Sequence, residues 1–377
     1  MSKLGRLRNC QEIAPGLFLC LLLMLAGIFG AEALGVLLKT TGVLPEDGVN
    51  PVSEIFIIIL LGILIRNTIG LNSRFVKGVT FSVQMVLKAG IVLLGLRLSL
   101  LEALALGAWG IPLIIACISV ALGVTLFCTK KLGQSARLGT LIASGTSICG
   151  LTAIMATAPV IKAKENEVAY AVANITIFGL TGMLIYPYII VFFFSDDPVK
   201  AGLFLGTAIH DTAQVTGAAL IYGDLINSAQ VVDVATVTKL IRNLFLIAVI
   251  PFVSVLLWKR DKESAVLPKW HQLVPLFIIG FFAMALLRTI GDATATASGE
   301  AFGLLAPGTW EQAAVAVSTF GSTYLFGIAM AGIGLSTSFN VFKGLGMKPF
   351  AIGFTAAFAV GAVSLVLISV FGDFIAV

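Results

Sequence analysis

Hydrophobic residues are gathered along the chain in eleven long runs that short polar stretches separate. Roughly 20 apolar residues in a row cross a bilayer as one helix, and most of the runs reach or approach that length. The runs do not alternate between apolar and polar positions as barrel strands do, so they predict transmembrane helices. The expected segments are approximately 15–38, 51–66, 75–98, 109–128, 136–161, 167–194, 199–222, 233–258, 270–290, 311–338 and 348–373.

The order of these segments contains an internal repeat. Each of two copies carries the same residues at one constant spacing: Gly90-Ile91, Gly95, Leu98-Ser99, Gly107 and Pro112 in the first, and Gly327-Ile328, Gly332, Leu335-Ser336, Gly344 and Pro349 in the second. The second and ninth segments also each end with an arginine, Arg66 and Arg288. We therefore predict that 51–128 repeats as 270–373.

A weaker echo links two polar, glycine-ended stretches inside apolar runs. These are Ser144–Gly150 in the fifth segment and Asp211–Gly217 in the seventh, with Asn174 and Asn243 in the segments that follow them. The echo predicts that 136–194 repeats as 199–258. Such stretches interrupt helices, and unwound backbone at membrane depth is tolerated where it lines a cavity or is buried in protein. Paired interruptions in two repeats point to the binding site of a transporter.

Two topologies are compatible with the interruptions. The fifth and seventh segments either cross the membrane as discontinuous helices or form re-entrant hairpins. Only hairpins make both sets of repeats inverted, so we expect nine crossings plus two re-entrant segments in a single transmembrane domain, 1–377. Most Lys and Arg residues of the loops then lie on the N-terminal side, which predicts a cytoplasmic N-terminus and an external C-terminus.

The N-terminus has basic residues followed by an apolar run, as a signal peptide does. The apolar run is long for a signal peptide, so we expect a first helix that is retained.

Composition supports a membrane protein and excludes several soluble classes. Apolar residues make up 58% of the chain and charged residues only 11%, which excludes a soluble enzyme, a disordered chain and a secreted disulfide scaffold. The net charge of +5 resides mostly in short loops, so it does not indicate nucleic-acid binding. With two histidines and five cysteines without metal-type spacing, we expect no metal and no cofactor.

The interrupted segments also carry a family resemblance. Ser144-Gly-Thr-Ser-Ile-Cys-Gly150, with Pro159 and Asn174 after it, and Ile209-His-Asp-Thr-Ala-Gln-Val215 resemble the YeiH-like family of bacterial inner-membrane proteins that carry the name sulfate exporter. The resemblance covers nearly the whole chain and implies a secondary transporter, distantly similar to inverted-repeat cation/proton antiporters and bile-acid-type symporters. The family often has Glu after the His, where this chain has Asp211.

The expected site lies where the two interrupted segments face each other. His210 and Asp211 form a buried acid–base pair suited to ion or proton coupling, or alternatively a capping acid beside a hydrogen-bonded His. Broken helix ends there would direct positive dipoles towards an anion. The polar and glycine residues expected around it are Ser144, Gly145, Thr146, Ser147, Cys149 and Gly150 from the first stretch and Thr212, Gln214 and Thr216 from the second.

Three cations lie within the apolar segments. Lys88 stands near the middle of its segment, where a charge costs about 3 kcal/mol, and we expect it to face the protein interior or water, as an anion contact or in an ion pair. Arg242 suits oxyanions because its fork binds two oxygens. Lys239 lies nearer the end of its segment, so we expect it to snorkel and to matter less than the other two. Asn174 and Asn243 would add two matched amides beside the breaks.

These features favour a secondary transporter, an exporter or exchanger, of a small anion such as sulfate, a related oxyanion or a carboxylate. The alternatives are a cation/proton antiporter with Asp211 as carrier, and an intramembrane enzyme that uses Ser147 or Cys149 with His210. We expect the protein not to be an enzyme. As partners we expect a small anionic substrate, a coupling proton or Na⁺ and the lipid bilayer, with no nucleic acid; a homodimer is left open.

Overall fold

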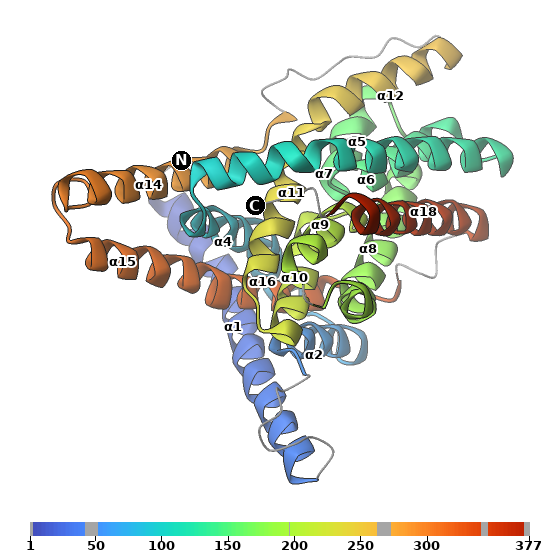
Figure 1. Cartoon of the computed structure of the whole chain (residues 1–377). Coiled ribbons are helices and arrows are strands. Elements are labelled where there is room, and N and C mark those ends of the chain that lie inside the picture. The colour runs from blue at the N-terminus through green and yellow to red at the C-terminus, as the bar shows by residue number, and fades with distance from the viewer. Residues whose placement is uncertain (1–2, 42–51, 196, 262–272, 341–345, 373–377) are drawn as a thin grey trace. The chain divides into compact units, whose positions relative to one another are not determined.

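The computed structural model is all-helical in the part of the chain that it describes, which confirms the expected helical class (Figure 1). It describes the whole chain except 1–2, 42–51, 196, 262–272, 341–345 and 373–377. The predicted segment starts at 51 and 270 lie outside the described residues. Local sequence explains where the helices begin: Ser135 and Asp197 cap two of them with side-chain oxygens, and Pro198 stands in the first turn of the second.

The helices belong to two compact units. The first unit contains α1 (Lys3–Thr40), α2 (Glu54–Thr68), α3 (Ser73–Phe81), η1 (Ser82–Val86), α4 (Leu87–Leu94), η2 (Gly95–Arg97), α14 (Leu276–Ser298), α15 (Pro307–Phe320), η3 (Gly321–Leu325) and α16 (Phe326–Ser336). The second contains α5 (Leu100–Lys131), α6 (Ala136–Ser147), α7 (Leu151–Val160), α8 (Glu165–Phe194), α9 (Pro198–Ala208), α11 (Gln230–Leu244), α12 (Leu246–Asp261) and α18 (Met347–Phe371). The helix α10 (Thr212–Ile226) begins in the second unit and ends in the first.

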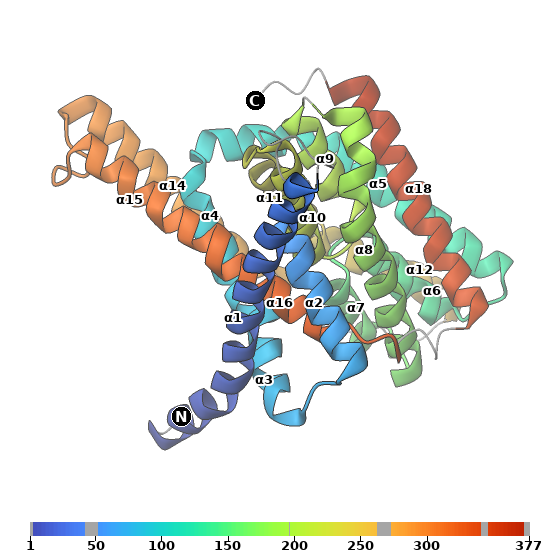
Figure 2. The same cartoon turned by 90° about the horizontal axis from the view of Figure 1, so that it is seen from below.

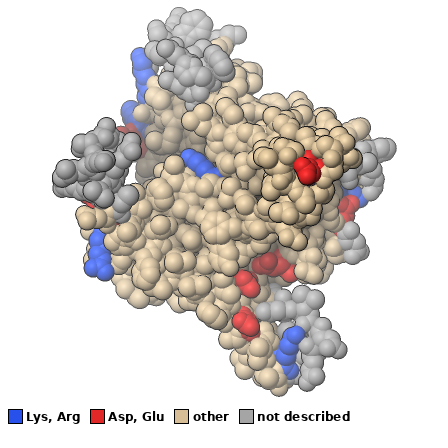
Figure 3. Space-filling model, turned by 90° about the vertical axis from the view of Figure 1, so that its left-hand side faces the viewer, with Lys and Arg blue, Asp and Glu red and all other residues tan. Residues whose placement is uncertain are grey.

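Seven helices among the described residues are long and apolar enough to cross a membrane. An eighth is added if α11 and α12, which meet at an angle of 43°, form one span. The face of the molecule in Figure 3 carries few charged side chains, as expected of a surface in lipid. The chain is therefore a multi-pass membrane protein.

Close helix contacts in the first unit occur at Gly95 and Gly334, within two residues of matched places in the sequence repeat. A Cβ at Gly334 of α16 would meet the Ile59 carbonyl oxygen and Gly62 Cα of α2. A Cβ at Gly95 of η2 would meet the carbonyl oxygen of Phe281 and the Cβ of Met284, both in α14. The second and ninth predicted segments thus each pack against a glycine of the third or tenth.

The third and tenth segments share one further irregularity. Each contains a single wide π turn, η1 between α3 and α4 and η3 between α15 and α16. The two turns have equal length, and each stands at the same distance before its contact glycine, Gly95 or Gly334. In the register of the sequence repeat the two turns are two residues apart; π turns inside α-helices are rare, so two that nearly coincide are not expected from composition alone.

In the second unit the interrupted segments are held by helices that follow them in sequence. Gly202 and Gly206 of α9 allow close approach of α11, at Val234 and Thr238. Gly145 of α6 faces Ile175 of α8 in the same way. Figure 2 shows α9, α10 and α11 together from below. Because the glycines have no side chain, the backbones of α9 and α11 lie close enough for long α11 side chains to reach the breaks.

Candidate functional site at two helix breaks

Both interrupted segments are broken, and both breaks are three residues long. In the fifth segment α6 ends at Ser147 and α7 begins at Leu151. In the seventh, α9 ends at Ala208 and α10 begins at Thr212. The second break therefore lies at 209–211, and most of the stretch Asp211–Gly217 is the first turns of α10 rather than unwound chain. The polar side chains there follow the break and cap the helix after it.

The two breaks share a short sequence that corrects the register of the echo. Gly145-Thr146-Ser147-Ile148 runs into the first break and Gly206-Thr207-Ala208-Ile209 into the second. Glycine, threonine and isoleucine recur at the same positions relative to the break. The sequence alignment of Ser144–Gly150 with Asp211–Gly217 is therefore in the wrong register. The residues Gly206–Ile209, which precede the second polar cluster, carry the signal for the correct alignment.

Lys239 of α11 joins the two breaks through their backbone. Its Nζ donates to the carbonyl oxygens of Ile148 at 2.7 Å, Ile209 at 2.9 Å and His210 at 2.5 Å. An ammonium has three protons, so all of its donor capacity is used. Ile148 and Ile209 are the matched isoleucines, and Lys239 therefore contacts equivalent carbonyls in both breaks.

Arg242, one turn further along α11, makes the same kind of connection. Its Nη2 donates to the Thr146 carbonyl at 2.7 Å and its Nη1 to the Thr207 carbonyl at 2.5 Å, and these are the matched threonines. Its Nε also donates to Ser147 O at 2.8 Å, and Nη1 to Ile209 O at 3.2 Å. The last carbonyls of a helix carry partial negative charge, so two cations at the C-terminal ends of α6 and α9 are electrostatically favourable.

The burial of these cations reverses one expectation. Lys239 and Arg242 are both 0% exposed. The expectation that Lys239 snorkels to the interface is therefore wrong, because α11 packs along α9 and its side chain finds acceptors at the breaks. Lys88 lies on α4 in the first unit, where its side chain is exposed.

The Asp211 carboxylate caps the helix that follows the second break and lies close to the start of the helix that follows the first. Its Oδ1 accepts from Ala213 N at 2.9 Å and so caps α10. A Cβ at Gly150, the residue directly before α7, would lie 3.2 Å from Asp211 Cβ and 3.3 Å from Oδ2. Gly150 has a φ of +65°, a conformation that suits glycine, and it gives α7 no side-chain cap. The two breaks are thus in direct contact.

The other polar groups of the second break are mostly buried. His210 is 2% exposed, its ring hydrogen-bonds to the Thr146 backbone, and its Nδ1 has no partner. Asn243 donates to Thr212 Oγ1 at 3.2 Å, while its Oδ1 is buried without a partner. Thr216 donates to Thr212 O at 3.0 Å within α10. Gln214 reaches α8, where its Nε2 lies 3.5 Å from Thr176 O and its Oε1 has no partner.

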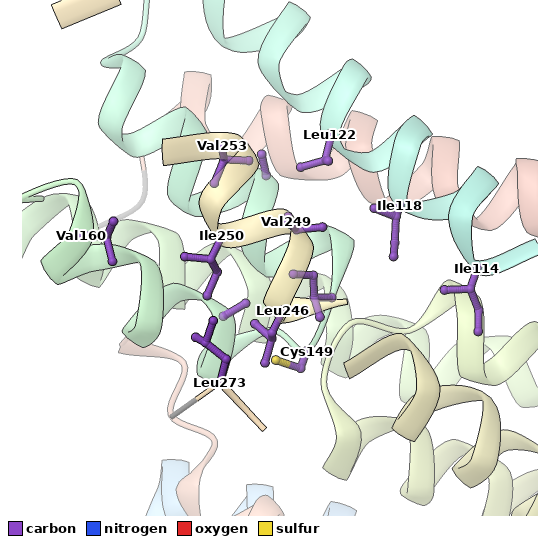
Figure 4. Close-up of a cluster of buried hydrophobic side chains, with 13 residues drawn as sticks. Ile114, Ile118, Leu122, Cys149, Val160, Leu246, Val249, Ile250, Val253 and Leu273 are labelled. Carbon is purple, nitrogen blue, oxygen red and sulfur yellow. The ribbon is translucent and has the colours of Figure 1, made fainter. Parts of the chain in front are cut away.

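The side chains of the first break point into their own helix or into apolar surroundings. Ser144 donates to Leu141 O at 3.0 Å and Ser147 to Ser144 O at 3.1 Å, so neither hydroxyl faces His210. Figure 4 shows Cys149 in a cluster of apolar side chains from α5, α7 and α12, which includes Leu246 and Val249. The Thr146 hydroxyl is buried without a partner. The main contribution of this stretch is its backbone carbonyls.

The two predicted amides do not have equivalent places. Asn243 lies at the second break, but Asn174 donates to Pro349 O of α18 at 2.6 Å, and a Cβ at Gly353 would meet its amide. The expectation of two matched amides beside the breaks is therefore wrong. Of the predicted residues, those from Ser144 to Gly150 and from His210 to Gln214 gather with Arg242 and Asn243 at the breaks, while Asn174 contacts another helix.

Comparison with known proteins identifies the family. The chain matches the family described as "Conserved hypothetical protein 698" over residues 15–353. It is 31% identical over 367 residues to a UPF0324 membrane protein of Fusobacterium nucleatum, with 95% of this chain and 98% of that protein covered. It is 30% identical to a UPF0324 membrane protein of Pseudomonas aeruginosa, with 92% and 91% covered, and 35% identical to one of Streptococcus agalactiae, with 74% and 78% covered. The chain therefore belongs to this family of bacterial membrane proteins, as its two interrupted motifs suggest.

Proposed function

We propose that the protein is a secondary active transporter, an exporter or exchanger, of a small anion such as sulfate, a related oxyanion or a carboxylate. It would be coupled to protons or Na⁺ and would work by alternating access in the bacterial inner membrane. The observation that carries the proposal is the junction of the two breaks, where Lys239 and Arg242 are buried beside a single carboxylate, Asp211. Ionisable residues within membrane segments are rare and mark substrate or ion pathways.

The charges at the junction favour an anion. Two helix C-termini and two helix N-termini meet there, and their partial charges cancel to a first approximation. The side chains leave two positive charges and one negative charge when Asp211 is ionised. The net charge of about +1 in a poorly hydrated place attracts an anion and repels a cation. This balance gives a cation/proton antiporter less support.

The proposal includes an inverted repeat, with nine crossings and two re-entrant segments. Supporting features are the equal breaks, the shared Gly-Thr and Ile positions, and the matched contacts of Gly95 and Gly334. Paired discontinuous helices near the membrane midplane are typical of transporters built from two repeats. An intramembrane enzyme has less support, since the Ser147 hydroxyl donates to Ser144 O and Cys149 packs among apolar side chains.

The test is flux through purified protein in liposomes. Vesicles loaded with sulfate, phosphate, acetate or chloride are given a pH gradient or a Na⁺ gradient, and efflux is followed with the membrane potential clamped. We expect gradient-dependent efflux of at least one anion, its loss in Arg242→Met, and wild-type efflux in Lys77→Met, whose exposed side chain lies in the first unit. Folded protein that moves no anion, or that exchanges Na⁺ for protons instead, would overturn the proposal.

A further inference from the structure

The Asp211 carboxylate occupies the place where an anionic substrate would be expected. It caps α10 through Ala213 N and lies against Gly150, the residue directly before α7. Helix N-termini attract anions because their amide groups are unpaired and their dipole is positive. A single side-chain anion of the protein therefore faces both positive helix ends at the breaks.

The charged and titratable groups around Asp211 come from three elements. Lys239 of α11 attracts it, and Cys149 of the first break lies close enough to interact with it electrostatically. His210 precedes it in the second break and interacts with Lys239 and Arg242. Lys239 directs its three N–H donors at backbone carbonyls. Asp211 is the carboxylic acid of this group. When it is ionised, its negative charge offsets one of the positive charges of Lys239 and Arg242; when it is protonated, it offsets neither.

The surroundings of Asp211 also contain unused hydrogen-bond acceptors. Asn243 Oδ1 and His210 Nδ1 are both buried without a partner. His210 is the neighbour of Asp211 in the chain, and Asn243 is hydrogen-bonded to Thr212 on its other side. Buried polar atoms of this kind usually have partners, so two at one place need an explanation. A protonated Asp211 would bring a hydroxyl donor to this place, where these two acceptors have none.

We propose that Asp211 is the coupling group and that it acts as a tethered competitor of the substrate anion. In the ionised state its carboxylate caps α10, lies beside the start of α7 and excludes an anion. When it takes one proton from the aqueous phase it becomes neutral, and one negative charge of substrate replaces its own. The proton and the monoanion bind together, and the net charge of the site stays at +1. This inference rests on the proposed function, and it names the proton as the coupling ion.

Calorimetry on the full-length protein in detergent tests the linkage. Each anion of the panel is titrated at several pH values, in two buffers that differ in ionisation enthalpy, so that the protons taken up per anion can be counted. For wild-type protein we expect uptake of up to one proton per monoanion and an affinity that falls as pH rises, by up to about tenfold per unit. An affinity that does not change with pH would overturn the coupling role while leaving anion binding intact.

Two variants distinguish the role of Asp211 as an acid from its role as a helix cap. Asp211→Asn retains a capping oxygen but has no acid, so we expect anion binding without proton uptake at any pH. The matched control is Asp197→Asn, because Asp197 caps α9 through Lys200 N at 2.9 Å, and we expect it to behave as wild type. Proton uptake that persists in Asp211→Asn would assign the coupling to another group.

A spectroscopic measurement covers the case in which Asp211→Asn does not fold. Infrared difference spectra of wild-type protein with and without bound anion should show the C=O band of a newly protonated carboxylic acid. The same band should appear, slightly shifted, in Asp211→Glu. Anion binding without this band would overturn the inference, whereas wild-type protein that binds no anion of the panel would instead contradict the proposed function.

Discussion

The two buried cations at the breaks direct nearly all of their hydrogen-bond donors at backbone carbonyls. Lys239 gives each of its three protons to a backbone carbonyl, and Arg242 makes four such bonds. Neither cation has much donor capacity left for a substrate in this state. Their effect on an anion is therefore the field they produce, while direct contacts would come from the helix N-termini and the neighbouring polar side chains.

At this scale we expect Lys239 to matter more than its place in the sequence indicates. Lys239→Met removes the Lys239 donor from the Ile148 and His210 carbonyls, and each such buried group costs about 1–3 kcal/mol, while Arg242 Nη1 still donates to Ile209 O. The expected result is a clearly lower Tm in detergent and loss of flux. Lys77→Met, at a largely exposed lysine, is the control and should be neutral. Equal Tm values for the two variants would contradict the role given to Lys239.

Gly150 provides a second test at the residue scale. Gly150 has a backbone φ of +65° and ψ of −116°, which a residue with a Cβ adopts only under strain. An added Cβ would also lie 3.1 Å from an Ile175 methyl group and 3.2 Å from Asp211 Cβ. We expect Gly150→Ala to cost roughly 1–3 kcal/mol of stability and to separate the two breaks. Gly123→Ala in α5 is the control, because nothing lies within 4 Å of its Cβ and alanine favours a helix. The comparison is made by thermal unfolding and flux; a stable, active Gly150→Ala would argue against the contact.

The two helix breaks were predictable from sequence, but the register of the second break and the depth of Lys239 were not. Polar, glycine-ended stretches predict interrupted helices, because such residues disfavour continuous helix in lipid, and both breaks exist. The register of the second break was missed, since Asp211 and the threonines after it belong to an N-terminal turn, where such residues are also common. The depth of Lys239 could not be predicted, because its acceptors are backbone carbonyls of distant segments and every residue type has a carbonyl.

Topology is tested at the element scale by labelling single cysteines. With re-entrant fifth and seventh segments, Lys164→Cys faces the cytoplasm and Asp197→Cys faces outside. A membrane-impermeant thiol reagent, applied to whole cells and to inverted vesicles of a cysteine-free background, distinguishes the two sides. Labelling on the opposite sides would replace the hairpins by full crossings and leave the transporter proposal intact.

For the whole molecule, composition was the strongest predictor. The apolar fraction and the length of the runs predicted a helical multi-pass protein, because only helices and closed barrels satisfy every backbone group in lipid. The number of crossings is harder to predict, since it depends on length and bending. The second segment, for example, is a helix of 15 residues, about 22 Å long, which is shorter than the hydrocarbon core. The division into two units follows from contacts between segments far apart in sequence.

The two wide turns η1 and η3 have a consequence for the history of the chain. A π turn has more residues than a regular helical turn, so it records a local insertion. The same insertion stands within two residues of the equivalent place in the third and tenth segments, before Gly95 and Gly334. If the two halves descend from one ancestral gene, the ancestor already carried the insertion when it doubled. A relative with the wide turn in only one half would reverse this order of events, or would show that the turn can be lost without losing the fold.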